Sequence, residues 1–295
     1  MRKFNLVALL VVLALAVQAQ SLWAGPPLVN LEGVGGIAFN PLAYPADSTG
    51  DNTHLTSDKT DIIGEPRFGS WYVNLHQKSI DWAAIGAADT LFKRLEVSYG
   101  YEAVAVAGTA NVHKSNLGAK LLLLPENAFG TKAVPAVSVG IIHKSASGVA
   151  GNSKYEVGDL VAGWFGPNVK SEGNDFYVVA TKLIPQLPRP VLLSAGLLAT
   201  DGYATGVLGF DDKHKGTGFG NVDIVWPLGF TTGFEYQQGA KFSDYKNPNY
   251  WDLHLAWFAT PNITAVLAYV NAGDVKSTDY FGLGEGTVLS LQHTF

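Results

Sequence analysis

The residues best suited to do chemistry are a histidine and a serine two positions apart, His143 and Ser145. Alternate residues of an extended chain point to one face, so a β-strand here would place both side chains side by side. The imidazole can then take the serine proton and leave an alkoxide that attacks an ester carbonyl, provided that a third group orients the imidazole. Glu156 or Asn152, on a neighbouring strand, would be that group. The spacing is a weak pattern, and Ser145–Gly148 also has the composition of an ordinary linker, so a loop without catalysis is the favoured alternative.

A second set of polar residues recurs at alternate positions of otherwise apolar segments. If these segments are strands of a barrel, the set lines the lumen. Its mixed charges predict ion pairs and bound water rather than a charge-selective wall. The set would either brace a closed interior or line a narrow pore for small polar solutes. Its members are Glu96, Glu102, Lys120, Lys182, Asp223, Glu235, Asp252, His254 and Gln292.

No motif points to a metal or a cofactor. The aspartates of the stretch Asp47–Asp61 could offer oxygen ligands to calcium, but the glycine and terminal glutamate of a calcium-binding loop are missing. We interpret this stretch as a solvated surface loop. The seven histidines are scattered and the chain has no cysteine, which excludes thiolate metal sites and disulfides. We therefore predict neither metal nor cofactor.

Alternation of apolar and polar residues predicts the elements that would position these side chains. It is clearest over 251–257, where Asp252 and His254 interrupt a row of tryptophan and leucine. The stretch 79–91 is either an extension of a strand or a short amphipathic helical turn. We predict about twelve strands, near 28–40, 66–76, 93–107, 114–124, 132–144, 174–184, 190–200, 217–226, 229–238, 249–259, 263–272 and 285–295.

Two kinds of connection alternate along the chain. Short links occur at about 125–131, 185–189, 226–229 and 259–262, whereas long polar links occur at about 41–65, 145–173, 201–216, 237–249 and 272–282. A transmembrane up-and-down antiparallel β-barrel has short turns at one end and long loops at the other. A Greek-key sandwich gives no reason for this asymmetry, so the pattern favours the barrel.

The beginning of the sequence predicts export. Arg2 and Lys3 precede an apolar stretch, Leu6–Val17, which is too short to cross a bilayer as a helix. We predict a cleaved signal peptide over 1–19, with a second candidate cleavage site after residue 24, and a single barrel domain over 25–295. Removal of the signal peptide leaves 18 basic and 25 acidic residues, a net charge of −7. This negative charge argues against nucleic acid as a partner. Charged residues form 15% of the chain, against roughly 25% in soluble domains, as expected for a surface that faces lipid.

The end of the sequence resembles the signal that the barrel assembly machinery reads. Leu289, Leu291 and Phe295 share one face of the last predicted strand, and the chain ends on an aromatic residue. His293 departs from the aromatic or aliphatic residue usual at its position. Aromatic residues also gather at the two expected ends of the strands, as girdles at a lipid interface do. We therefore expect this machinery, outer-membrane lipid and lipopolysaccharide as partners.

The chain as a whole resembles a family of predicted bacterial outer-membrane proteins whose domain has no assigned function. The resemblance rests on Arg94–Tyr99, Asn116–Leu121, Ala180–Leu183 and Trp251–Phe258 followed by Ala268–Val270. It implies the barrel and the bacterial outer membrane, and it implies no activity. The pair His143 and Ser145, on the parity of Val137 and Ile141 that we expect to face lipid, also resembles the outward His-x-Ser of outer-membrane phospholipases and lipid A deacylases.

The sequence thus predicts an outer-membrane β-barrel, most simply a narrow pore for passive transport of a small hydrophilic solute. One alternative is a lipid hydrolase that uses His143 and Ser145 with Glu156. The other is a closed barrel with a structural or export-associated role. The alternation leaves open the solute, whether the lumen is plugged, and the oligomeric state.

Overall fold

The computed structural model describes residues 28–46, 62–106, 110–149, 152–156, 169–243 and 246–295. The predicted signal peptide and the acidic stretch Asp47–Asp61 lie outside the described residues. Within the described part of the chain, no helix is long and apolar enough to span a bilayer.

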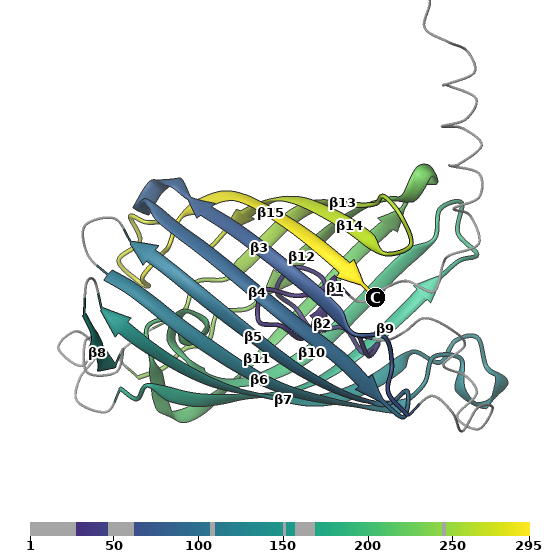
Figure 1. Ribbon diagram of the computed structural model, residues 1–295, viewed down its shortest axis with the longest axis horizontal. Coiled ribbons are helices and arrows are strands. Elements are labelled where there is room, and N and C mark those ends of the chain that lie inside the picture. Colours follow the sequence, from purple (N-terminus) through teal and green to yellow (C-terminus); the bar gives the residue numbers. More distant parts are fainter. Residues whose placement is uncertain (1–27, 47–61, 107–109, 150–151, 157–168, 244–245) are drawn as a thin grey trace, which may run out of the picture.

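Twelve antiparallel strands form a closed barrel, which confirms the predicted all-β fold class. Strands that follow one another along the chain pair side by side, and the last pairs with the first to close the ring (Figure 1). The strands are β3 (Arg67–Leu75), β4 (Ile80–Leu91), β5 (Leu95–Val106), β6 (Ala110–Leu124), β7 (Ala136–Val149), β9 (Glu172–Ile184), β10 (Val191–Gly202), β11 (Phe210–Val225), β12 (Phe230–Gln237), β13 (Tyr250–Phe258), β14 (Ile263–Asn271) and β15 (Glu285–Thr294).

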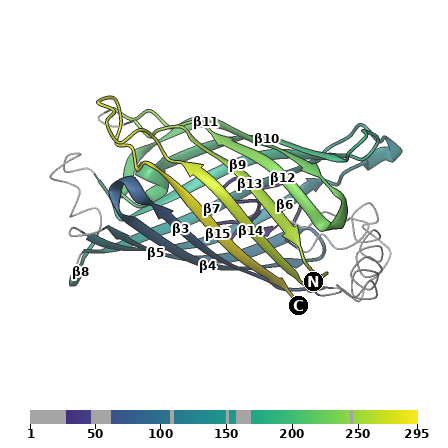
Figure 2. The same ribbon diagram turned by 90° about the horizontal axis from the view of Figure 1, so that it is seen from above.

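The two ends of the barrel differ, as the connection lengths predict. At the end where β15 finishes, which we call the turn end, the links include 185–190, 226–229 and 259–262. At the opposite end, the loop end, longer links join β12 to β13 and β14 to β15, and the short strand β8 (Asn152–Glu156) extends the sheet beyond β7. This end also has short links: the 3₁₀ segment His76–Lys78 lies between β3 and β4, and β5 ends at Val106, only four positions before β6 begins at Ala110. Seen from above, β3 lies beside β15 along the closing seam (Figure 2).

The outward face of the barrel is apolar. Along β13 the burial alternates, with Leu253, Leu255 and Trp257 exposed and Asp252 and His254 buried. Trp226, Trp257 and Phe295 are exposed at the turn end, and Tyr236 and Tyr269 at the loop end. This distribution is that of an apolar band between two aromatic girdles.

The predicted strand at 28–40 is wrong, and β4 takes its place in the ring. Residues 28–46, which we call the luminal segment, lie inside the barrel and contain only the two-residue strands β1 (Leu28–Val29) and β2 (Gly35–Gly36) (Figure 1). The barrel wall surrounds this segment on all sides, so most of its residues are apolar. Its composition therefore resembles that of a buried strand. The stretch left ambiguous at 79–91 forms a full barrel strand because its alternate residues, such as Trp82 and Ala84, pack inward.

Candidate functional site in the lumen

The luminal segment is held by charged and amide side chains that project inward from the strands. Its first anchor is Glu235 on β12, whose carboxylate accepts hydrogen bonds from the consecutive backbone N–H groups of Ala38, Phe39 and Asn40 at 3.3, 2.9 and 3.4 Å. Glu235 is fully buried. Three converging N–H groups satisfy a carboxylate that has lost its water, so this anchor depends on the backbone of the segment rather than on its side chains.

The second anchor is a buried ion pair between Glu96 on β5 and Lys120 on β6, with Nζ and Oε2 2.7 Å apart. Gly35 donates its N–H to Glu96 at 2.8 Å and accepts from Lys120 at 2.8 Å, and the N–H of Ala46 also donates to Glu96 at 2.8 Å. A Cβ added at Gly35 would lie 2.5 Å from the Glu96 carboxylate, so only glycine permits this approach. The pair thereby binds both halves of the segment.

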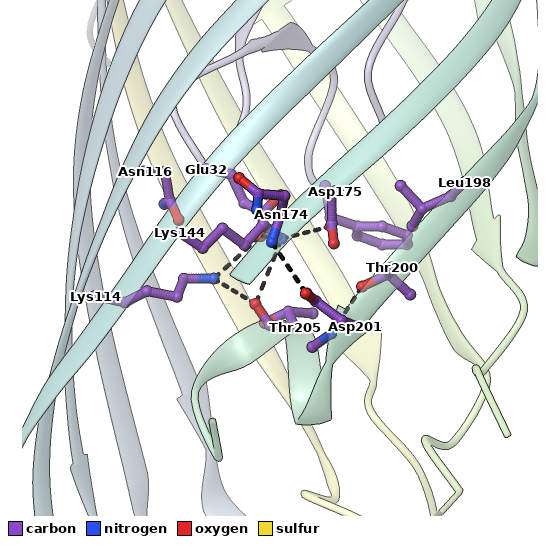
Figure 3. Close-up of polar contacts among 12 residues, drawn as sticks. Glu32, Lys114, Asn116, Lys144, Asn174, Asp175, Leu198, Thr200, Asp201 and Thr205 are labelled. Carbon is purple, nitrogen blue, oxygen red and sulfur yellow. Dashed lines mark hydrogen bonds and ion pairs between the residues drawn. The ribbon is translucent and has the colours of Figure 1, made fainter. Parts of the chain in front are cut away.

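The third anchor joins two lysines of the wall through one acid of the segment. Glu32 pairs with Lys114 on β6 at 3.0 Å and with Lys144 on β7 (Figure 3). Each lysine has a second carboxylate, Glu102 for Lys114 at 3.0 Å and Asp175 for Lys144 at 2.7 Å. Burial by itself would raise the pKa of Glu32, but the two ammonium groups outweigh it and lower the pKa to about 2.

Two further contacts fix the ends of the segment. Gln292 on β15 accepts from the N–H of Val29 and donates to its carbonyl, both at 3.1 Å, and the indole N–H of Trp71 donates to the same carbonyl at 2.8 Å. At the other end, the phenol of Tyr44 donates to Glu126 at 2.8 Å. Burial and the neighbouring carboxylate of Glu126 raise the pKa of Tyr44, so it remains a donor.

A fourth polar group of the lumen is formed by side chains of the wall alone. The ring nitrogens of His254 lie 2.7 Å from Asp252 and 2.7 Å from Asp223. These three buried residues come from β13 and β11, across β12. They therefore brace the wall next to the Glu235 anchor.

Eight of the nine predicted luminal residues face the interior and are buried, namely Glu96, Glu102, Lys120, Asp223, Glu235, Asp252, His254 and Gln292. Lys182 is placed on the other face. Tyr177, Val179 and Thr181 are the buried residues of β9, so Lys182 points outward and pairs with Glu126 at 2.8 Å. Tyr177 and Val179 lie inward because they pack against apolar residues of the luminal segment, including Leu42 and Tyr44.

Several residues that hold the segment were not among the predicted site residues. The inward orientation of Lys114 and Lys144 could have been predicted from alternation. Lys114 is an even number of positions from the predicted luminal residue Lys120, and Lys144 lies between the two residues predicted to face outward, His143 and Ser145. Ser138 follows the same alternation on β7 and donates to the Ala43 carbonyl at 2.5 Å. Thr181 accepts from the Ala43 N–H at 2.8 Å, but it lies on β9, where alternation did not identify the inward face. No alternation identifies Glu32, because it lies outside the barrel strands.

The predicted outward pair lies on the face that was expected for it. His143 is exposed and Ser145 is half-buried on the outward parity of β7. The two predicted third groups lie on β8, with Glu156 opposite Ser147 and Asn152 opposite Val149 in the register. His143 also makes a side-chain contact with a third strand. The contact belongs to Asn174 on β9, whose Oδ1 lies 3.0 Å from His143 Nδ1. The long link after β7 concealed this pairing from sequence analysis.

Two small cavities lie beside the luminal segment in the described part of the chain. One cavity of about 40 Å³ lies beside Glu32 and Lys144, and another of about 80 Å³ lies between Trp71 and Tyr250. A cavity needs roughly 10–15 Å³ of such volume to hold one water, so each of the two has room for a few waters.

The barrel is similar to solved outer-membrane barrels at low sequence identity. The KdgM porin in complex with disordered oligogalacturonate has a TM-score of 0.50 and 10% identity, covering 78% of this chain and 99% of that one. The COG4313 outer-membrane channel from Pseudomonas putida F1 has a TM-score of 0.45, with 11% identity over 81% and 100% of the two chains. Outer-membrane phospholipase A from Escherichia coli has a TM-score of 0.39, with 9% identity over 82% and 96%. These likenesses concern the fold.

No curated protein sequence matches the chain well enough to count as a relative. The model of a family described as a protein of unknown function, DUF3034, matches residues 29–292. That match spans the luminal segment and nearly all of the barrel, from the first anchored residue, Val29, to the last, Gln292. The chain belongs to the DUF3034 family.

Proposed function

We propose that this protein is a channel of the bacterial outer membrane for small hydrophilic solutes, and that the luminal segment closes it. The turn end would face the periplasm, and lipid and lipopolysaccharide would contact the apolar outward face. The fold shared with the KdgM porin supports this proposal. The solved complex of that porin contains an oligogalacturonate, a hydrophilic chain.

The observation that carries the proposal is the way in which the segment is attached. Its anchors at Glu235, Glu96 and Glu32 are hydrogen bonds and ion pairs, all of which water can replace when the segment moves. The emptied wall would present these buried lysines, acids and amides beside apolar side chains such as Trp71 and Tyr177, so a polar path would run along part of it. Twelve strands lie between the eight that side chains alone can fill and the sixteen that leave a wide aqueous channel, so a narrow passage would remain.

The test measures conductance in planar bilayers. The parent chain should give small or rare steps, and a variant lacking residues 28–46 should give frequent ones. Glu235→Gln provides a milder test, because its amide NH₂ cannot accept from the converging N–H groups of the segment, and it should increase the open time. Asp81→Asn removes a carboxylate from the outward surface, where Asp81 binds Tyr72 and Asn74, and should not change conductance.

A cross-link makes the test independent of the deletion. The chain has no cysteine, so Ala43→Cys with Ser138→Cys, two residues in contact, can be oxidised to tie the segment to β7. In the Glu235→Gln background the oxidised protein should be closed and the reduced protein open. Correctly folded deletion protein without conductance would contradict the channel, and would favour a closed barrel with a structural or export-associated role.

A further inference from the structure

We propose that the outward face of β7 and β9 carries a hydrolytic site for the acyl esters of membrane lipid, with Ser145 as nucleophile, His143 as base and Asn174 as positioning residue. The proposal is independent of the channel, because these side chains face away from the lumen. Three observations carry it: the hydrogen bond between His143 and Asn174, the placement of Ser145, and the surface on either side.

The contact with Asn174 determines which ring nitrogen of His143 carries the hydrogen. Asn174 Oδ1 is an acceptor, so the nitrogen 3.0 Å away, His143 Nδ1, carries the hydrogen. The neutral ring then has its lone pair on Nε2, the nitrogen that a general base needs. His143 is exposed, so Nε2 is accessible to a substrate from the lipid side.

Ser145 lies on the same face of β7, about 7 Å further along at the rise of a β-strand, a distance that the imidazole can bridge. Ser145 is opposite Ser115 of β6 in the register. The hydroxyl of Ser115 lies 3.3 Å from that of Tyr99. Backbone N–H groups within a sheet are occupied by neighbouring strands, so these hydroxyls are the donors at hand for an oxyanion beside Ser145.

The surroundings indicate the substrate. Leu117, opposite His143 on β6, and the neighbouring Ile141 and Phe176 are exposed apolar side chains on which an acyl chain can lie. On the other side, towards the loop end, lies an open, polar concavity of about 590 Å³. The charged residues of its lining are four acids, Glu172, Asp201, Asp211 and Asp212, and one base, Lys170, with His214 beside them. The ester of a membrane lipid occupies the same boundary between acyl chains and headgroup. The carboxylates suit a headgroup that bears an ammonium.

The reaction is a two-step ester hydrolysis. Ser145 Oγ attacks the acyl carbonyl carbon while its proton passes to His143 Nε2, and the bond to the alcohol breaks as the alcohol oxygen takes that proton. Water then attacks the acyl-serine, gives a proton to His143, and the fatty acid leaves as Ser145 recovers its proton. The sum is ester plus water to carboxylic acid plus alcohol, with no other reactant.

The first experiment measures fatty-acid release by the full chain in mixed micelles of phosphatidylethanolamine and, separately, of lipid A. Release from either substrate supports the site, and the better substrate identifies the lipid. Ser145→Ala should reduce release to the background rate. Ser147→Ala removes the next hydroxyl on the same face and should retain the activity. Heat-modifiable gel mobility of each variant shows that the barrel is folded.

The second experiment separates chemistry from structure. His143→Ala should lower the rate by roughly 10²–10⁴-fold, the usual contribution of a general base. Asn174→Ala should also lower it, and Asn174→Asp should restore much of it because a carboxylate accepts from Nδ1 equally well. A long-chain sulfonyl fluoride should label Ser145 in the parent and in Ser147→Ala, and should not label His143→Ala.

Folded parent protein that releases no fatty acid from either lipid and takes no sulfonyl label would overturn the proposal. Equal activity of Ser145→Ala and the parent would do the same. Neither result bears on conductance, so the failure of this site and the failure of the channel remain distinguishable.

Discussion

At the scale of single residues, Glu32 is the acid whose removal tests the attachment most directly. It faces Lys114 and Lys144, and behind them Glu102 and Asp175. Glu32→Gln should weaken the attachment by about 3 kcal/mol, the lower end for breaking a buried pair, because each lysine keeps a second carboxylate. Faster hydrogen–deuterium exchange of the peptide that contains residues 28–46 would report this loss. Asp81→Asn should exchange like the parent.

The same residue predicts a pH dependence. The pKa of Glu32 is lowered from 4.5 to about 2, so its contribution to the attachment is complete above pH 4.5 and is lost as the pH falls through about 2. Exchange of the luminal segment, corrected for the intrinsic effect of pH, should therefore be constant between pH 5 and 8 and should accelerate below 4.5. Glu32→Gln should lack the part of this acceleration that Glu32 causes. Acceleration above pH 6 in the parent would contradict the assignment.

The sequence was most informative where one face of a strand is polar and the other meets lipid. Asp252 and His254 could be placed because leucine and tryptophan surround them on β13. Lys182 could not, because Tyr177 and Val179 face an apolar part of the luminal segment, and alternation then carries no information about which side is inside. The partner of His143 was hidden for another reason. The register between β7 and β9 depends on a long link and not on local pattern.

At the scale of elements, the outward face of a strand and a turn at the barrel end differ in how well they tolerate a charged side chain. Leu255→Arg places a charge on the outward face in the middle of β13, where it should cost roughly 2–4 kcal/mol. Leu187→Arg, at an exposed position of the turn between β9 and β10, should cost at most about 1 kcal/mol because it lies at the interface. Denaturant titration in lipid vesicles measures both. Equal losses would mean that Leu255 does not face the bilayer core.

At the scale of the molecule, the barrel depends on the seam between β15 and β3. Phe295 packs edge-on against Phe68 at 5.3 Å and donates its N–H to Pro66 at 3.2 Å, so it contributes to closure as well as to the expected recognition signal. Deletion of Phe295 should leave protein in the periplasm, whereas Phe295→Tyr, which keeps the ring, should assemble. Normal surface levels and heat-modifiable mobility of the deletion would contradict the role of this residue.

The enclosure of the luminal segment also constrains the order of folding. The seam joins residues far apart in sequence, since the hydrogen bond from Ser70 to Leu291 spans 221 positions, and such contacts form late. Val29 bonds to Gln292 of the last strand, β15, and Gly35 bonds to Glu96 of an early strand, β5. The segment therefore contacts strands from both ends of the barrel sequence. It can therefore complete its contacts only when the last strand of the barrel is in place.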